Sequence, residues 1–324
     1  MTRYRNALPQ LGDDLFLTDG GVETTLIFHE GIDLPDFAAF YLLRNESGTA
    51  ALRKYFRTYA SIAARFNAGL ILESVTWRAS ADWGSKLGYS ATTLADANRA
   101  AIRLLEEIRG EMAHSQPVVI SGCVGPRGDG YVPGRAMTAQ EASEYHREQM
   151  DTFAETAADM VGAFTINYAA EAVGIARAAE SAGMPVAISF TVETDGNLPT
   201  GQPLGAAIRE VDEATANYPS YYMLNCAHPE HFDRALAGGE PWTARIRGLR
   251  ANASRRSHAE LNESADLDMG DPSELGSLYA QLRRNRLPRL NVIGGCCGTD
   301  HRHVERMVEA CVPLVRSARS ASTG

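Results

Sequence analysis

Several features are scarce in this sequence of 324 residues, and each scarcity argues against a class of protein. No stretch approaches the roughly 18 to 20 consecutive apolar residues of a membrane-spanning helix, so no membrane partner is expected. The first residues, MTRYRNALPQ, lack the apolar core of a secretory signal, which favours a cytoplasmic protein. The formal net charge of -9 argues against a nucleic-acid partner, because nucleic acids recruit basic surfaces.

Lysine and cysteine are also few. Only two lysines, Lys54 and Lys86, accompany 29 arginines, which leaves few candidates for Schiff-base chemistry. The five cysteines are an odd number, and two of them, Cys296 and Cys297, are adjacent. A framework of disulfides is therefore a poor interpretation, and a metal-binding or catalytic role for cysteine is a better one.

Short apolar runs alternate with helical segments along the chain. Three segments with apolar residues at helical spacing are 92–112, 139–158 and 169–182. The predicted strands are eight: Leu15–Thr18, Leu70–Glu73, Val118–Ser121, Met160–Phe164, Val186–Phe190, Tyr221–Asn225, Ile246–Ala251 and Leu290–Ile293. Eight such units predict an α/β protein with a single (β/α)₈ TIM barrel. A doubly wound sheet is disfavoured, since DGGVE and not a GxGxxG turn follows the first strand.

No repeat or linker divides the chain. We therefore expect one barrel domain over residues 12–315, with terminal tails at 1–11 and 316–324. The polar stretch 252–273 is long for a loop, and we expect it to form a lid or a segment of the barrel rim.

Three cysteines follow two of the predicted strands. Cys226 follows the sixth strand, and Cys296 and Cys297 follow the eighth within GGCCGT. The strand ends of a barrel converge on its C-terminal rim, so three thiolates can meet at one ion. Zn²⁺ suits thiolates, and three protein ligands leave one position open for a substrate thiol. A zinc-bound thiolate is a nucleophile near neutral pH, and the natural reaction is its attack on an activated methyl group.

Other interpretations of these cysteines stay open. Adjacent cysteines are often only small buried hydrophobic residues, and Cys226 at a second strand end is what favours a metal. A barrel that binds zinc or a thiol without catalysis is a second alternative. A hydrolase that uses zinc-bound water is disfavoured. Zinc sites of hydrolases are rich in histidine and carboxylate, whereas the ligands expected here are all thiolates.

At this point the sequence resembles the homocysteine S-methyltransferase family, through DGG at residue 19, NC at 225 and GGCCGT at 294. The resemblance runs from about Asp14 to Val315. It implies a zinc-dependent enzyme of methionine biosynthesis that moves a methyl group onto homocysteine. It implies Cys226, Cys296 and Cys297 as the catalytic zinc ligands. It also implies that Asp19 meets the ammonium group of homocysteine and that backbone N–H groups of the glycine turn meet its carboxylate. The substrate-binding residues expected are Asp19, Gly20, Gly21, Val22, Glu73, Trp77, Phe164, Glu193 and Asn225.

One departure from the family concerns the acceptor. Phe164 stands where the family usually has a glutamate that helps to bind the ammonium group, and a phenyl ring cannot accept a hydrogen bond. Either Glu73 or Glu193 substitutes for it, or the acceptor is a different thiol. For Asp19, Gly20 and Gly21 a plain tight turn is the alternative. Val75, where the family often has asparagine, is a second departure in the same region.

The methyl donor is expected to be a small onium compound, because 324 residues leave no room for the additional folate and cobalamin modules of methylfolate-dependent relatives. S-methylmethionine, S-adenosylmethionine and a betaine are the candidates. Aromatic faces attract such cations, and four rings follow the second and third strands: Trp77, Trp83, Tyr89 and Tyr131. Packing of the rim is the alternative role for these rings.

Overall fold

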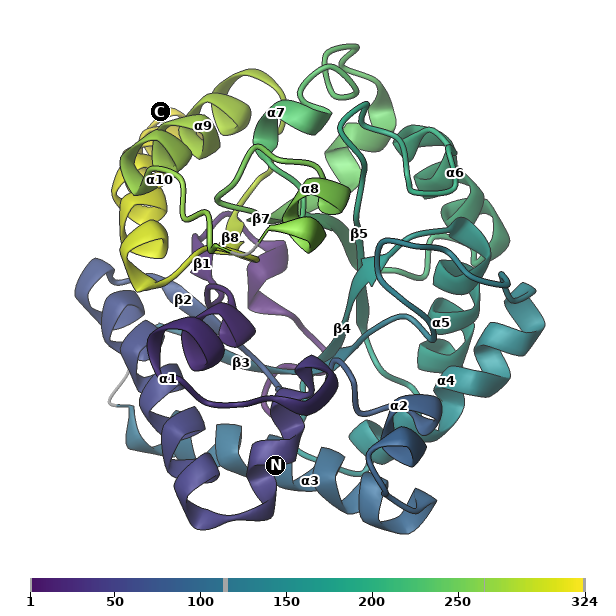
Figure 1. Cartoon of the computed structure of the whole chain (residues 1–324). Helices are drawn as coiled ribbons and strands as arrows, with labels where there is room; N and C mark the ends of the chain where they lie inside the picture. Colours follow the sequence, from purple (N-terminus) through teal and green to yellow (C-terminus); the bar gives the residue numbers. More distant parts are fainter. Residues whose placement is uncertain (1, 113–115, 265, 323–324) are drawn as a thin grey trace.

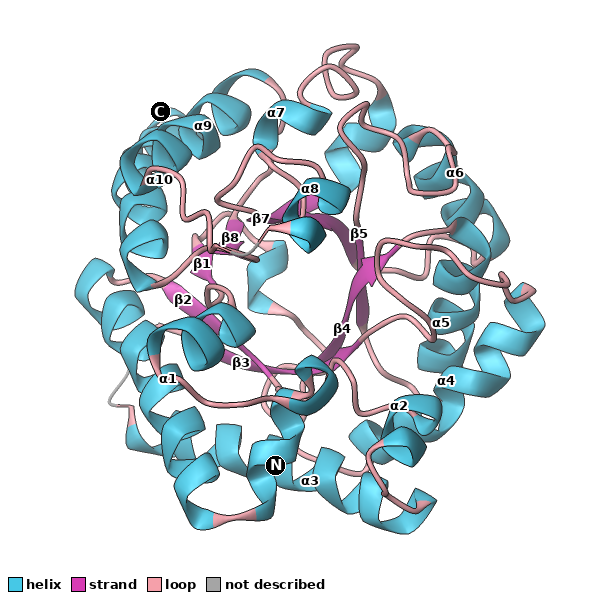
Figure 2. Ribbon diagram, in the orientation of Figure 1, coloured by secondary structure: helices cyan, strands magenta, loops and turns pink. Residues whose placement is uncertain are grey.

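The computed structural model describes residues 2–112, 116–264 and 266–322. Its eight strands are parallel and form a closed barrel in the order β1 to β8, with β8 paired to β1. Helices surround the strands as an outer ring (Figures 1 and 2). The chain therefore forms a (β/α)₈ TIM barrel, which confirms the predicted fold class.

The strands are those that the sequence predicts, with small changes at their ends. They are β1 (Phe16–Leu17), β2 (Gly69–Glu73), β3 (Val118–Val124), β4 (Met160–Ile166), β5 (Val186–Phe190), β6 (Tyr221–Asn225), β7 (Ile246–Ala251) and β8 (Val292–Gly295). Nearly every strand residue is buried, because helices cover one face of the sheet and the barrel interior fills the other.

The helices alternate with the strands. They are α1 (Glu46–Phe66), α2 (Ala81–Lys86), α3 (Ala91–Glu111), α4 (Ala139–Ala154), α5 (Ala169–Ser181), α6 (Leu204–Ala214), α7 (Pro229–Phe232), α8 (His258–Glu263), α9 (Pro272–Asn285) and α10 (His301–Ser322). Shorter helical turns are η1 (Pro9–Leu11), η2 (Thr24–His29), η3 (Pro35–Phe37), η4 (Ala39–Arg44) and η5 (Pro241–Arg245). Capping boxes at Ser90, Thr138 and Ser257 begin α3, α4 and α8.

Two apolar clusters form the core. The larger lies between the strands and the outer helices, and the smaller fills the barrel interior. The interior cluster includes Phe16, Ile71, Met160, Phe164 and Tyr221. The barrel is therefore a packed core rather than a pore, and substrates have access only at its ends.

The segments that the sequence suggested as tails are partly structured. Leu8 and Gln10 are buried, and the backbone amides of Arg3 and Tyr4 donate to Asp159 Oδ1 at 2.6 and 2.9 Å. At the other end α10 continues to Ser322, and residues 1, 323 and 324 of these tails lie outside the described residues. In the described ranges no helix combines the length and the apolar character that crossing a membrane requires.

The polar stretch after β7 lies at the carboxyl end of the barrel. It contains α8, and Figure 1 shows this short helix inside the outer ring, over the strand ends. The side chain of His258, the first residue of α8, meets the backbone carbonyl of Cys226 just past β6. This segment therefore lies on the rim where the predicted site residues converge.

Candidate metal centre

The three cysteines meet at the carboxyl end of the barrel. Cys226 directly follows β6, and Cys296 and Cys297 directly follow β8. Their sulfur atoms all lie within 4.8 Å of one another. The Sγ atoms of Cys226 and Cys296 are in direct contact, and the Cα atoms of these two residues are 5.5 Å apart. Cys226 is buried, Cys296 is half-buried and Cys297 is exposed, so the cluster opens toward the rim on the Cys297 side.

This donor set fits zinc. With Zn–S bonds of about 2.3 Å, the sulfur atoms of a tetrahedral site lie about 3.8 Å apart, which this cluster can adopt through small side-chain rotations. Thiolates are soft ligands that favour zinc over magnesium or calcium. Three protein ligands leave one tetrahedral position for a further thiol, and the exposed Cys297 marks the side from which that thiol can enter.

The backbone around Cys226 is held in an unusual conformation. Cys226 has φ +55°, a left-handed value that is costly for a residue with a side chain, and such strain is found at functional sites. The Asn225 Nδ2 group donates to Cys226 Sγ at 3.1 Å and to Thr165 Oγ1 at 2.8 Å. The Asn225 Oδ1 atom accepts from the Thr165 amide at 2.9 Å and from Ser189 Oγ at 2.7 Å. Asn225 therefore contacts a cysteine sulfur, where its N–H stabilises a thiolate.

Asn252 links the two cysteine segments. Its Nδ2 group donates to the backbone carbonyl of Cys226 at 3.0 Å, and its Oδ1 atom accepts from the amide of Cys297 at 3.1 Å. Because one amide side chain contacts both segments, the distance between β6 and β8 at the rim is fixed independently of any metal.

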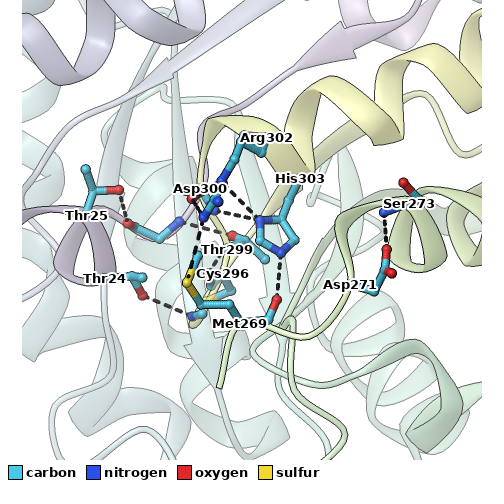
Figure 3. A network of polar contacts seen from close by, with 12 residues as sticks. Thr24, Thr25, Met269, Asp271, Ser273, Cys296, Thr299, Asp300, Arg302 and His303 are labelled. Carbon is cyan, nitrogen blue, oxygen red and sulfur yellow. Dashed lines mark hydrogen bonds and ion pairs between the residues drawn. The ribbon is translucent and has the colours of Figure 1, made fainter. Parts of the chain in front are cut away.

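The cysteine loop rests on the turn after β1. Gly298 has φ +76°, and its amide donates to Thr24 Oγ1 at 3.0 Å. Thr299 Oγ1 donates to the carbonyl of Cys296 at 2.7 Å, and the Gly21 amide donates to the carbonyl of Thr299 at 3.1 Å. These bonds, several of which Figure 3 shows, hold both neighbouring sulfurs in place.

A polar network anchors the same loop on its other side. The His303 ring places Nδ1 3.1 Å from Asp300 Oδ1 and Nε2 2.8 Å from the carbonyl of Met269 (Figure 3). Arg302 Nε donates to Asp300 Oδ2 at 2.9 Å. Although burial opposes it, hydrogen bonds from His303 and Arg302 hold the pKa of Asp300 below its usual value. Asp300 is therefore a fixed anion that ties the rim segment at Met269 to the start of α10.

The predicted substrate loop after β1 lies against the cysteine loop. A Cβ atom on Gly21 would lie 2.7 Å from the carbonyl oxygen of Cys296, and one on Gly20 would lie 2.6 Å from the Tyr59 hydroxyl. Close approach of the two loops therefore requires Gly21, and Gly20 leaves room for Tyr59 of α1. The Gly21 amide already donates within the chain, and Val22 is half-buried against the larger core cluster.

Asp19 is buried, and both of its oxygens have partners. Its Oδ1 atom pairs with Arg250 Nη2, and its Oδ2 atom accepts from the Tyr55 hydroxyl at 2.9 Å. Burial raises the pKa of Asp19, while Arg250 and Tyr55 oppose that rise. Arg250 is a site residue that the sequence reasoning missed.

Of the two glutamates proposed to substitute for the family residue, Glu73 lies beside Phe164. A Cβ atom on Gly162 would meet the Phe164 ring at 2.6 Å and Glu73 Oε2 at 3.0 Å, so ring and carboxylate are neighbours. Burial raises the pKa of Glu73 to about 7. Glu193 lies elsewhere on the rim, with Oε1 3.1 Å from His258 Nδ1.

The aromatic residues divide into two groups. The Tyr131 hydroxyl lies 3.7 Å from Cys297 Sγ, and its ring lies 4.1 Å from the His258 ring, measured between centroids. Trp77 Nε1 donates to the carbonyl of Phe164 at 3.2 Å, which places that indole beside the interior cluster. Trp83 and Tyr89 contact cationic side chains of the chain itself, and Arg78 Cζ also lies over the Trp77 ring, 4.3 Å from its centroid.

Three residues near the cysteines were not singled out in the sequence reasoning: Arg250, Asn252 and His258. Arg250 and Asn252 occupy the end of β7 and the position after it, the same rim position that singled out the cysteines, so the rule for strand ends could have found them. His258 lies in the polar stretch after β7, and only its fold over the rim brings it to Cys226. Glu23 is also half-buried close by, and burial and Asp19 raise its pKa to about 7.

Comparison with known proteins finds similar sequences and a similar fold. The sequence pattern of the family described as "Homocysteine S-methyltransferase" matches residues 16–311. The curated protein "Homocysteine S-methyltransferase 4" from Zea mays is 23% identical over 313 residues, covering 91% of this chain and 88% of that protein. The fold is similar to that of the homocysteine methyltransferase MmuM from Escherichia coli. Its oxidized form aligns with a TM-score of 0.74 and 18% identity over 94% of this chain and 99% of that one. Its metallated form has a TM-score of 0.72 at the same identity, over 94% of this chain and 98% of that one.

Proposed function

Since the chain belongs to the homocysteine S-methyltransferase family and is a methyltransferase, we propose that it transfers a methyl group from a small onium donor to a thiol held at a zinc ion. The observation that carries this proposal is the meeting of three cysteine sulfurs within 4.8 Å at the carboxyl end of the barrel. Homocysteine, which would give methionine, is the acceptor that the family name suggests.

We assign Cys226, Cys296 and Cys297 as the zinc ligands. Zinc bound there would supply a Lewis acid that keeps an added thiol ionised near neutral pH. Asn225 and Asn252 position these ligands: the first donates to Cys226 Sγ, and the second joins the backbones of Cys226 and Cys297. Partners that orient a ligand in this way contribute to metal affinity.

The methyl transfer itself is a displacement. A lone pair on the acceptor sulfur forms the new S–C bond while the bond from the methyl carbon to the onium atom breaks, and the donor leaves as a neutral thioether or amine. The chain must therefore hold an onium cation close to the acceptor sulfur. Tyr131 is the ring best placed for this role, because its hydroxyl lies 3.7 Å from Cys297 Sγ. Aromatic faces stabilise such cations by about 0.5 to 2 kcal/mol.

His258 and Glu193 support that ring. The His258 ring packs on Tyr131 at a centroid distance of 4.1 Å, and Glu193 Oε1 lies 3.1 Å from His258 Nδ1. This arrangement connects α8 to the loop after β3. Trp77, close to Phe164, is the second ring that we assign to substrate binding.

The test is product mass spectrometry on reduced, zinc-loaded protein. A panel of small thiols that includes homocysteine is offered separately with S-methylmethionine, S-adenosylmethionine and glycine betaine. We expect a methylated thiol above the no-enzyme control with one of these donors, and loss of that product in Cys226→Ser. Absence of every methylated thiol from folded, zinc-replete protein would overturn the proposal.

A further inference from the structure

A buried arginine lies beside the cysteine cluster. Arg250, at the end of β7, is 9% exposed. Its Nε atom donates to the carbonyl of Gly295 at 3.1 Å, the residue before Cys296. Its Nη2 atom donates to the carbonyl of Gly20 at 3.1 Å and pairs with Asp19 Oδ1. The guanidinium group therefore lies between the turn after β1 and the cysteine loop, where the body of a thiol bound to the cluster would extend.

The nearest carboxylate is already neutralised by this arginine. Asp19 is 7% exposed, and its second oxygen accepts from the Tyr55 hydroxyl at 2.9 Å. An ammonium group on a ligand would have to share the charge of Asp19 with Arg250, because the arginine already pairs with Asp19 Oδ1. The ammonium group would then lie next to the guanidinium group and be repelled by it.

The other side of the guanidinium group faces a phenyl ring. The Arg250 Cζ atom lies 5.2 Å from the centroid of Phe164, and this ring cannot accept a hydrogen bond from an ammonium group. Glu73 lies next to the ring, and its buried Oε2 atom has no hydrogen-bond partner among the described residues. Because burial raises the pKa of Glu73 to about 7, this carboxylate is only partly ionised at neutral pH.

We propose that the acceptor is a small thiol that carries an anionic group but no ammonium group, and that Arg250 determines this selectivity for the acceptor. This inference rests on the proposed function. In the described part of the chain Arg250 Nη1 makes no hydrogen bond, so it is free to donate one to a carboxylate of the ligand. A charge-assisted bond of this kind is strong, whereas a second cation next to the guanidinium group is repelled.

Three thiols test the effects of the ammonium group and of the carboxylate group separately. L-Homocysteine and 4-mercaptobutyrate differ only in the α-ammonium group, and propane-1-thiol lacks both the ammonium and the carboxylate. For each thiol, the dissociation constant from zinc-loaded protein is measured by calorimetry without donor, and kcat/KM is measured with one donor. We expect the dissociation constant of 4-mercaptobutyrate to be about 100-fold lower than that of homocysteine and its kcat/KM to be about 100-fold higher, the size that a like-charge contact of a few kcal/mol gives. Propane-1-thiol should bind more weakly than 4-mercaptobutyrate by about tenfold.

Variants of Arg250 test its role directly. Arg250→Met removes the cation and leaves Asp19 open to an ammonium group, so the ratio of the two dissociation constants should shift toward homocysteine by at least about tenfold. Arg250→Lys keeps a cation beside Asp19 and should retain the wild-type preference. Arg250→Lys therefore gives a measurement of selectivity even if Arg250→Met does not fold. In Glu73→Gln, the preference for 4-mercaptobutyrate should also persist.

The outcomes separate the two proposals. Equal or tighter binding of homocysteine by the wild type would overturn the role of Arg250 while leaving the methyltransferase proposal intact. Homocysteine binding that disappears in Glu73→Gln would likewise overturn it, because Glu73 would then hold the ammonium group. If no thiol is methylated, the proposed function fails, and the three dissociation constants still decide the selectivity.

Discussion

Replacement of Glu73 by glutamine is expected to stabilise the protein, and to do so more as the pH rises. Burial raises the pKa of Glu73 from 4.5 to about 7 in the folded chain, with Arg250 opposing the rise. The folded state therefore keeps a proton that the unfolded state loses above about pH 4.5. The contribution of Glu73 to the free energy of unfolding therefore falls as the pH rises to about 7 and is constant above that value.

The size of the effect follows from the shift. About 2.5 pKa units at about 1.4 kcal/mol each give roughly 3 kcal/mol at full ionisation, and most of this appears between pH 5 and pH 8. For a chain of 324 residues the unfolding entropy is about 0.7 kcal/mol per kelvin, so the gain in Tm is about 4 °C.

The assay is thermal unfolding of wild type, Glu73→Gln and Glu148→Gln at pH 5 and pH 8. Glu148 is an exposed residue of α4, and its variant should follow the wild type at both values. We expect the Tm difference between Glu73→Gln and wild type to grow by about 4 °C from pH 5 to pH 8. A difference that is the same at both values would refute the reasoning, and a difference of opposite sign would mean that Arg250 keeps Glu73 ionised.

The remaining predictions concern the cysteine cluster. Cys226→Ser should lower the zinc content from about one ion per chain to well below half by elemental analysis, whereas Cys311→Ala, in the buried face of α10, should keep it; equal zinc in both would refute a three-thiolate site. Gly298→Ala should lower the free energy of unfolding, measured in urea, by about 2 to 4 kcal/mol, because Gly298 has φ +76° and a Cβ atom there would lie 2.6 Å from a carbonyl oxygen. Gly134→Ala, where a Cβ atom would meet open space, should lower it by less than about 1 kcal/mol. Equal losses in the two variants would contradict this prediction. His303→Ala should weaken zinc binding about tenfold in a chelator competition, since it removes a support of the cysteine loop, and an unchanged affinity would show that the loop is held without it.

The architecture could be predicted from the sequence because each strand is a short buried apolar run. The least accurate prediction was the eighth strand, placed at 290–293 and found at Val292–Gly295. Glycine has a low propensity for β-strands, so consecutive glycines are expected to end a strand. In the barrel, however, Gly294 and Gly295 pair with Arg250 and Ala251 of β7, and a Cβ atom on Gly294 would lie 1.9 Å from Thr18 Oγ1. Barrel closure, a long-range property, therefore extends this strand.

The candidate site could be predicted in part for the same reason. The meeting of Cys226 with Cys296 and Cys297 follows from the convergence of strand ends, which is a general property of the barrel. The pairing of Asp19 with Arg250 does not follow from spacing, because an arginine in a strand is usually taken to face solvent. Only the closed order of the strands places β7 close enough to the turn after β1 for this ion pair to form.

Zinc K-edge X-ray absorption, recorded with and without an acceptor thiol, tests the central claim most directly. We predict three sulfur ligands at about 2.3 Å in the zinc-loaded protein and a fourth sulfur at a similar distance after 4-mercaptobutyrate is added. The first spectrum tests the three cysteines, and the change tests the open position for the substrate. A shell dominated by nitrogen or oxygen, or a sulfur count that does not change with any thiol, would contradict the account.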